Sequence, residues 1–155
     1  MLDFIRIACA VPNGKTADVK KNAREICAWM EKAEEQNADV ILFPELALTG
    51  YTCGDLFFQN SLHNGVKEGV REIARCSAAH PQLTAVVGLP VRVGGMLYNC
   101  AAVFSRGEIV GLVPKTRLTT AEKRWFSPAS GECHWLTPEA LGLVGSEDYW
   151  TIPVT

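Results

Sequence analysis

The feature that most constrains the fold is a helical pattern flanked by two short apolar runs near the N-terminus. Residues 4–11 (FIRIACAV) form an apolar run that is rich in strand formers and closes at Pro12. Over residues 18–36, apolar side chains recur every three or four positions and therefore lie on one helical face. Residues 40–43 (VILF) are too few for a helix and stop at Pro44. This order predicts a βαβ unit.

A second helix and a series of strands are expected after this unit. Residues 61–79 again carry apolar side chains at helical steps, and Pro81 lies beyond them. Strand patterns then follow in close succession at residues 83–89, 97–104 and 108–113. Turns at residues 94–95 and 106–107 separate these runs and predict hairpins, so this part of the sheet is antiparallel or mixed. Two long helices followed by consecutive strands predict a layered α/β (α+β) fold.

Two further predictions concern the ends of the first helix and the C-terminal part of the chain, where the pattern is weaker. Asp18 is expected to cap the first helix and Asn37 to end it. Residues 127–148 mix Pro, Gly, Ser and Glu without a sustained period and predict a loop, whereas residues 149–154 (YWTIPV) predict a last strand. We expect residues 1–155 to form part of one domain, with no second domain in this chain.

Charge and hydropathy argue against two classes of partner. The chain has 15 Lys and Arg against 17 Asp and Glu, with no basic block, which is unlike a nucleic-acid-binding surface. Its apolar runs are far shorter than the ~20 residues needed to cross a bilayer. Arg6 lies inside the apolar start rather than before it, which is unlike a secretory signal. We therefore expect a cytoplasmic protein that binds neither nucleic acid nor membranes.

The cysteine pattern gives no support for a metal site or a disulfide scaffold. The six cysteines include no CxxC pair, and the three histidines lie far from one another in the sequence. Structural zinc sites combine closely spaced thiols and imidazoles, so we expect no metal site. A chain of 155 residues can build its own hydrophobic core, so a disulfide framework is not required.

Two oppositely charged residues occupy equivalent places in the predicted sheet. Glu45 and Lys115 each follow a proline that ends a predicted strand. If these strand ends share one sheet edge, the carboxylate could act as a base and the ammonium could stabilise an oxyanion. Each residue also has a simpler interpretation, because Glu45 could begin a solvated helix and Lys115 could lie on the surface.

The residues around this pair resemble a known family. The segments FPELALTGY and VPKTRL resemble the glutamate and lysine motifs of the nitrilase (carbon–nitrogen hydrolase) superfamily. The segments GYTCGDLFFQ, VVGLPVRVGGMLYNCAAVFSRGEIVGLVPK and EKRWFSPA are similar to the N-terminal glutaminase domain of glutamine-dependent NAD synthetases. The resemblance runs from about residue 4 to residue 130. It implies a nitrilase-like αββα sandwich, of which this chain supplies the N-terminal portion.

The resemblance also implies roles for single residues. Glu45 corresponds to the general base and Lys115 to the oxyanion-stabilising lysine of a Glu-Lys-Cys triad. Tyr51, in the TGY motif, and Glu122 are the candidates for substrate binding. Glu122 is the only carboxylate in TRLTTAEKR, a stretch that is shorter than its family counterpart.

The family's catalytic cysteine has no match in this chain, and the resemblance places it beyond Thr155. Two cysteines in predicted loops, Cys53 and Cys133, could in principle substitute for it. A thiolate with a neighbouring base and cation is all that the chemistry formally needs. We interpret both as free loop thiols instead, and expect this chain alone to be inactive.

The implied activity is hydrolysis of the glutamine side-chain amide through a thioester, which supplies ammonia. No cofactor is implied for this step. ATP and Mg²⁺ belong to a synthetase domain, which is the expected partner in a longer chain and whose SGGxDS phosphate loop is absent here. A homo-oligomer is expected. Two alternatives remain open: a stand-alone nitrilase-type amidase that acts on another small amide, and an inactive truncated domain that serves as a scaffold.

Overall fold

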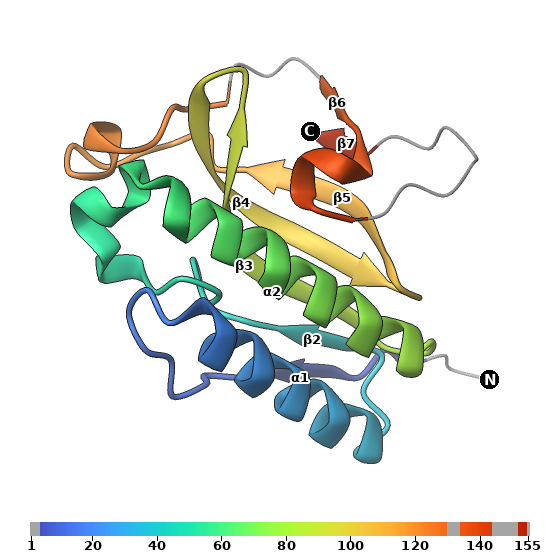
Figure 1. Cartoon of the computed structure of the whole chain (residues 1–155). Coiled ribbons are helices and arrows are strands. Elements are labelled where there is room, and N and C mark those ends of the chain that lie inside the picture. The colour runs from blue at the N-terminus through green and yellow to red at the C-terminus, as the bar shows by residue number, and fades with distance from the viewer. Residues whose placement is uncertain (1–3, 130–133, 144–151, 155) are drawn as a thin grey trace.

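Seven strands form one mixed sheet in the computed structural model of this chain, which describes residues 4–129, 134–143 and 152–154. The strand order is β1-β2-β3-β4-β5-β7-β6 (Figure 1). Strands β1, β2 and β3 are parallel, and the β3-β4 and β4-β5 pairs are antiparallel. The strand bounds are Ile7–Cys9, Val40–Leu42, Thr84–Val93, Met96–Ser105, Glu108–Pro114, His134–Leu136 and Ile152–Val154 for β1 to β7.

Two long helices make the parallel crossovers. Helix α1 (Val19–Glu35) joins β1 to β2, and α2 (Asn60–Ala79) joins β2 to β3, so the predicted βαβ unit is confirmed. The Asp18 side chain accepts a hydrogen bond from the Lys21 backbone N–H and caps α1 as expected. Asn37, at φ +53°, follows the end of α1 in the left-handed conformation that asparagine tolerates.

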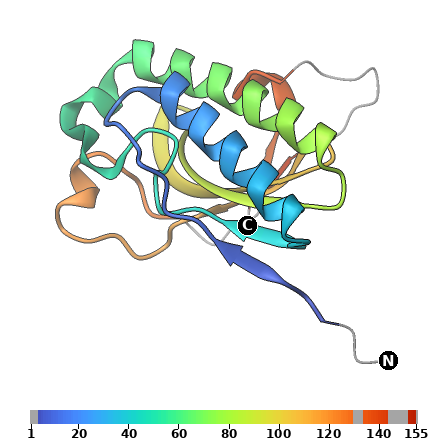
Figure 2. The same cartoon turned by 90° about the horizontal axis from the view of Figure 1, so that it is seen from below.

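Both helices lie on one face of the sheet, as Figure 2 shows from below. The hydrophobic core lies between these helices and that face. Alternate residues of a strand point to opposite faces. Side chains such as Ile41, Val87 and Leu112 are fully buried on the helix side. On the opposite face lie exposed apolar side chains, and no helix within the described ranges covers them. They include Ile7 (57% exposed), Leu42 (38%), Val110 (50%) and Val113 (51%).

The hairpins match the turn chemistry of the sequence. Gly94 and Gly95 both have positive φ, as do Arg106 and Gly107, and two such residues suit the tight turns that join twisted antiparallel strands. Strand β3 continues through Pro90 to Val93 and is therefore longer than the run predicted over residues 83–89. The layered α/β prediction is confirmed.

Two expectations differ from the structure, and one further element had not been predicted. The strand predicted over residues 4–11 is limited to Ile7–Cys9, because only these residues pair with β2. A 3₁₀ segment, η1 (Tyr51–Phe58), occupies residues that carry no helical period. The loop predicted over residues 127–148 is wrong at His134–Leu136, which is β6, and at Pro138–Leu141, which is the 3₁₀ turn η3.

The last predicted strand is confirmed in part. Residues Ile152–Val154 form β7, while residues 149–151 lie outside the described residues. Strand β7 pairs with β5 in parallel and with β6 in antiparallel orientation. Strand β6, which was not predicted, has only three residues and is too short for a strand period to be recognisable in sequence. No helix in the described part of the chain has the length and hydropathy to cross a membrane.

Candidate active site

A turn that crosses closely over β3 positions Glu45. After β2, the Phe43 backbone N–H donates to the Val86 carbonyl at 3.0 Å, and the Leu48 N–H donates to the Gly88 carbonyl at 3.1 Å. A Cβ atom on Gly88 would lie 2.5 Å from the Pro44 carbonyl oxygen, so only glycine permits this approach. The backbone of residues 44–48 is thereby held against the sheet, with Glu45 at the C-terminal end of a parallel strand.

Lys115, the second predicted catalytic residue, lies next to Glu45. Lys115 directly follows β5 in the sequence. Its backbone N–H donates to the Asn99 carbonyl at 2.7 Å, and this bond holds the residue beside β4. Its Nζ donates to Glu45 Oε1 at 2.8 Å and to Glu122 Oε1 at 2.7 Å. The hydrogen bonds to Glu122 and then to Glu45 raise the pKa of Lys115 above its usual range. Lys115 is therefore a cation at neutral pH and cannot serve as a base.

Glu122 is buried and held by its own turn. The side chain is 2% exposed, and its Oε2 accepts a hydrogen bond from the Thr119 backbone N–H at 2.7 Å. The Glu122 N–H in turn donates to Thr119 Oγ1, which makes a reciprocal capping box at the start of the 3₁₀ turn η2 (Glu122–Arg124). The hydrogen bond from Lys115 is the main reason that the pKa of Glu122 lies well below its usual range.

Asn99 is a further member of the cluster that sequence reasoning missed. It lies in β4, is 4% exposed, and its Nδ2 donates to Glu45 Oε1. Glu45 Oε1 thus receives hydrogen bonds from two donors, Asn99 on β4 and Lys115 directly after β5. The available signal was an amide side chain within the otherwise apolar run of a predicted strand, because a buried polar group there needs a partner.

Contacts with η1 hold the segment that carries Glu122. Asp55 accepts two hydrogen bonds from the Arg124 guanidinium, each at 3.0 Å, and one from Trp125 Nε1 at 3.0 Å. Phe57 packs edge-on against Phe126, with ring centroids 4.9 Å apart. These contacts join residues 51–58 to residues 122–126 across the site.

A cavity of about 220 Å³ lies beside the charged cluster. Glu45, Asn99 and Lys115 line it together with apolar residues of β3, β4 and β5, among them Val86, Ala101 and Val113. Val113 is half exposed on the sheet face opposite the helices, so the cavity opens on that face. A carboxylate and an ammonium beside an apolar-lined cavity can remove a proton and stabilise developing negative charge on a small bound molecule.

Other residues singled out from sequence do not join this cluster. Tyr51 is 50% exposed and is not among the residues that line the cavity, so its role in substrate binding stays a prediction. Cys53 is buried, its thiol donates to the Thr49 carbonyl at 3.1 Å, and burial raises its pKa. Cys100 lines the cavity, but burial raises its pKa to about 12, which disfavours the thiolate. Cys133 lies outside the described residues.

The residues that the structure describes include no group of three or more His, Cys, Asp or Glu side chains arranged to hold a metal ion. The polar groups beside the cavity are two carboxylates, one amide and one ammonium, and the ammonium occupies the space between the carboxylates.

Comparison of the sequence with known proteins identifies a family and several relatives. Residues 6–147 match the model of the carbon-nitrogen hydrolase family. The chain is 34% identical over 134 residues to a glutamine-dependent NAD(+) synthetase of Mycobacterium tuberculosis, a match that covers 83% of this chain and 19% of that protein. A glutamine-dependent NAD(+) synthetase of Xylella fastidiosa is 34% identical over 158 residues, with 97% and 28% covered. The matches thus span only 19% to 28% of these relatives' length.

Solved structures agree with this relationship. The glutamine-dependent NAD(+) synthetase of Cytophaga hutchinsonii has a TM-score of 0.79 and 28% identity, with 98% of this chain and 25% of that chain covered. An amidase from Nesterenkonia sp. shares the fold, with a TM-score of 0.74, 24% identity, and 86% and 51% covered. The family match covers most of the chain, including Glu45, Lys115 and Glu122. This chain belongs to the carbon-nitrogen hydrolase family.

Proposed function

We propose that this chain is the N-terminal portion of a glutaminase domain that supplies ammonia in a glutamine-dependent NAD synthetase. The observation that carries the proposal is the Lys115 ammonium, held between Glu45 at 2.8 Å and Glu122 at 2.7 Å beside a cavity. The similarity to NAD synthetases over 83% to 97% of the chain favours glutamine as the amide.

Glu45 is the proposed general base. Its side chain is 41% exposed and lines the cavity, so it is accessible to a substrate and a nucleophile. Glu122 is 2% exposed, and hydrogen bonds from Lys115 and Thr119 occupy its oxygens. We therefore assign Glu122 to positioning Lys115. Asn99 has the same task for Glu45, because its amide donates to the carboxylate and limits its rotation.

The proposed reaction uses a cysteine that follows Thr155 in a longer polypeptide. Glu45 takes the proton of this thiol, and the sulfur attacks the side-chain amide carbon of glutamine. The Lys115 ammonium stabilises the oxyanion of the tetrahedral intermediate. The protonated Glu45 then gives its proton to the departing nitrogen, which leaves as ammonia and a thioester remains. Glu45 next activates a water molecule, and hydrolysis of the thioester releases glutamate and restores the thiol.

The proposed glutaminase role also implies which surface the second sheet covers and which domain uses ATP. The apolar sheet face around Val110 and Val113 is the surface on which the second sheet of an αββα sandwich packs. The glutaminase step uses no cofactor, whereas ATP and Mg²⁺ act in the synthetase domain. We further propose that the complete protein is a homo-oligomer.

A glutamine analogue that carries a diazoketone in place of the side-chain amide tests the location of the nucleophile. Such a reagent alkylates the thiol that attacks the amide carbon, and peptide mass spectrometry of the full-length protein identifies the labelled cysteine. We expect one labelled cysteine beyond Thr155 and no label on Cys53 or Cys100. Label on a cysteine of residues 1–155 would refute the assignment of the nucleophile.

The same experiment separates the alternatives. Labelling by the glutamine analogue that excess glutamine prevents supports a glutaminase. Labelling that small aliphatic amides prevent, and glutamine does not, would instead indicate a nitrilase-type amidase. A protein that is not labelled and releases no ammonia from either amide would fit the scaffold alternative.

A further inference from the structure

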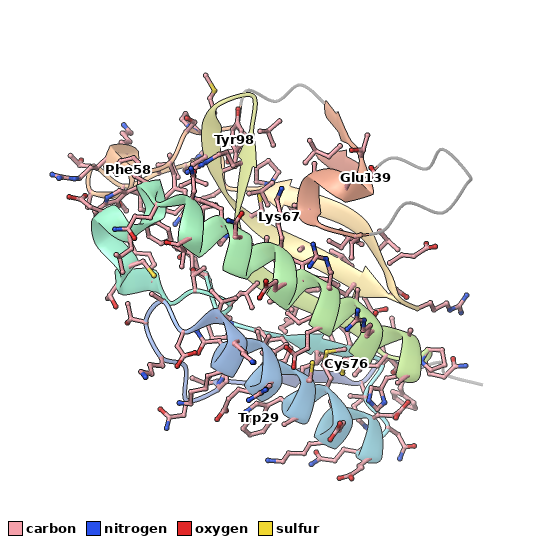
Figure 3. The ribbon with its side chains drawn as sticks, viewed as in Figure 1. Trp29, Phe58, Lys67, Cys76, Tyr98 and Glu139 are labelled. Carbon is pink, nitrogen blue, oxygen red and sulfur yellow. The ribbon has the colours of Figure 1, made fainter. Side chains whose placement is uncertain are left out.

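Two cysteines from different helices meet on the side of the sheet away from the candidate active site. Cys27 lies in α1 and Cys76 in α2, and both are half-buried between these helices. The Cys76 thiol lies 3.9 Å from the Cys27 carbonyl oxygen, and the Cys27 thiol lies 4.0 Å from the Glu72 carbonyl oxygen. Figure 3 shows Cys76 on the side of α2 that faces α1, with sulfur atoms gathered between the helices.

A charged pair lies next to the two thiols. His80 follows Cys76 by four residues, so the two side chains lie on the same side of α2 at its C-terminal end. The imidazole Nδ1 is 2.5 Å from Glu34 Oε2 on α1. Burial alone would lower the pKa of His80, but the hydrogen bond to Glu34 and the neighbouring Cys76 raise it above its usual value. A protonated imidazole is therefore favoured beside Cys76.

The two thiols are electrostatically unequal. The two neighbouring thiols act on each other with opposite sign, so the pKa of Cys27 is raised and the pKa of Cys76 is lowered. Burial, the negative charge of Glu31 and the C-terminal end of the α2 dipole oppose a thiolate at Cys76. The neighbouring Cys27 thiol and the His80 imidazole favour the thiolate, and the pKa of Cys76 lies below its usual value. Cys76 is thus the thiol that ionises first, and Cys27 retains its proton.

We propose that Cys76 and Cys27 form a peroxide-reactive cysteine pair that closes into a disulfide between α1 and α2. The Cys76 thiolate attacks one oxygen of hydrogen peroxide, the O–O bond breaks, and Cys76 becomes a sulfenic acid while hydroxide leaves and is protonated to water. The Cys27 sulfur then attacks Cys76 Sγ, the S–O bond breaks, and a second water leaves. Two thiols lose two electrons and two protons, and one peroxide is reduced to two waters.

This pair is independent of the proposed amide chemistry. Cys27 and Cys76 belong to the helix layer, whereas the cavity beside Glu45 opens on the opposite face of the sheet. The disulfide would tie together the two helices that cover the core. It therefore links oxidation to the stability of the helix layer without consuming a residue of the charged cluster.

Peptide mass spectrometry of the full-length protein tests the proposal directly. The protein is treated with equimolar hydrogen peroxide, its remaining thiols are blocked, and it is digested with trypsin without reduction. Residues 25–32 and 76–92 are tryptic peptides that each contain one cysteine. We expect these two peptides to be linked, with a mass two hydrogens below their sum, and the link to disappear with dithiothreitol. The buried Cys53 and Cys100 should remain reduced.

Variants distinguish this chemistry from random oxidation. In Cys27→Ser, Cys76 should accumulate as a sulfenic acid that dimedone traps, whereas Cys76→Ser should leave Cys27 reduced. His80→Gln should slow alkylation of Cys76 at pH 7 by roughly tenfold, with unchanged circular dichroism, because the charge that favours the thiolate is lost. The proposal is overturned if Cys76 is oxidised no faster than Cys53, or if the linked peptide does not form while the fold is intact.

Discussion

Residue-scale geometry in this protein centres on a single lysine. Sequence reasoning placed Glu45 and Lys115 at equivalent strand ends where they could meet, and the structure places their charged atoms 2.8 Å apart. The sequence reasoning left Glu122 as a weaker candidate, although the capping-box spacing of Thr119 and Glu122 is visible in the sequence. Asn99 was missed because the register between β3, β4 and β5 decides which strand residue faces Glu45. A linear sequence does not reveal that register.

Replacing Glu122 by glutamine should destabilise the protein in a pH-dependent way. The pKa of Glu122 is depressed by Lys115, so its contribution to the free energy of unfolding is fully present above the unfolded pKa of about 4.5. The contribution declines as the pH falls toward the folded pKa of about 2. We expect Glu122→Gln to cost about 1 to 2 kcal/mol at pH 7, a value reduced because Lys115 is one-third exposed.

Urea unfolding at pH 7 and at pH 2.5 measures this effect. The difference between wild type and Glu122→Gln should shrink at the lower pH. The exposed Glu35, substituted in the same way, serves as the control and should change little at either pH. An equal loss of stability at both pH values would contradict this account, because the effect would then not come from the charge of the Glu122 carboxylate.

Gly88→Ala tests the close approach that positions Glu45. The new methyl group would meet the backbone of residues 44–46, which cannot move without shifting Glu45. Overpacking of this kind typically costs about 1 to 3 kcal/mol, and we expect ammonia release from glutamine to fall with it. Gly111→Ala is the matched control, because nothing lies within 4 Å of a Cβ at that strand position. Equal activity in both variants would contradict the positioning role of Gly88.

At the scale of elements, the helices and the short strand β2 were predictable to within one or two residues, whereas the bounds of β1, β6 and β7 were not. The bounds of α1 and α2 follow from an apolar period sustained over 17 and 20 residues. Strands β1, β6 and β7 have three residues each, and their pairing partners define them more than their own sequence does. The η1 segment depends on contacts with residues 122–126, which are distant in sequence.

Asn22 connects α1 to the turn that carries Glu45. It is 2% exposed, and its side chain bonds to the Lys15 backbone N–H, the Lys15 carbonyl and the Leu48 carbonyl. Asn22→Ala leaves the Lys15 N–H and the Leu48 carbonyl without this partner, whereas the Lys15 carbonyl still accepts from the Asp18 N–H, so we expect a loss of about 2 to 3 kcal/mol in the free energy of unfolding. Chemical denaturation checks this value. Arg24→Ala, at an exposed position of the same helix, should stay within about 0.5 kcal/mol of wild type.

The whole molecule combines a well-covered sheet face with an open one. The family relationship and the layered α/β fold were predictable, because the charged motifs and the helix periods extend over most of the chain. The open face was predictable only through the resemblance to an αββα sandwich. Exposed side chains such as Ile7, Leu42, Val110 and Val113 show where that face lies.

The 155-residue chain, produced alone, should self-associate through this face. Apolar sheet surface without a covering layer promotes association between copies. We expect the apparent mass in light scattering to rise with concentration, and Val110→Lys with Val113→Lys to reduce that rise. Met96→Lys is the control, because Met96 is 54% exposed but lies beside the β3-β4 turn. A monomer at all concentrations, or an equal effect of the control, would contradict this expectation.

The central claim is that Glu45 is the general base of glutamine hydrolysis, which deprotonates first the thiol and then the water. The most direct test measures ammonia release from glutamine by the full-length protein and its Glu45→Gln variant, together with NAD formation from added ammonium. We expect glutamine-dependent release to fall by at least about 100-fold, since general bases contribute 10²- to 10⁴-fold, while ammonium-supported NAD formation continues. Near-normal ammonia release by Glu45→Gln would contradict the account.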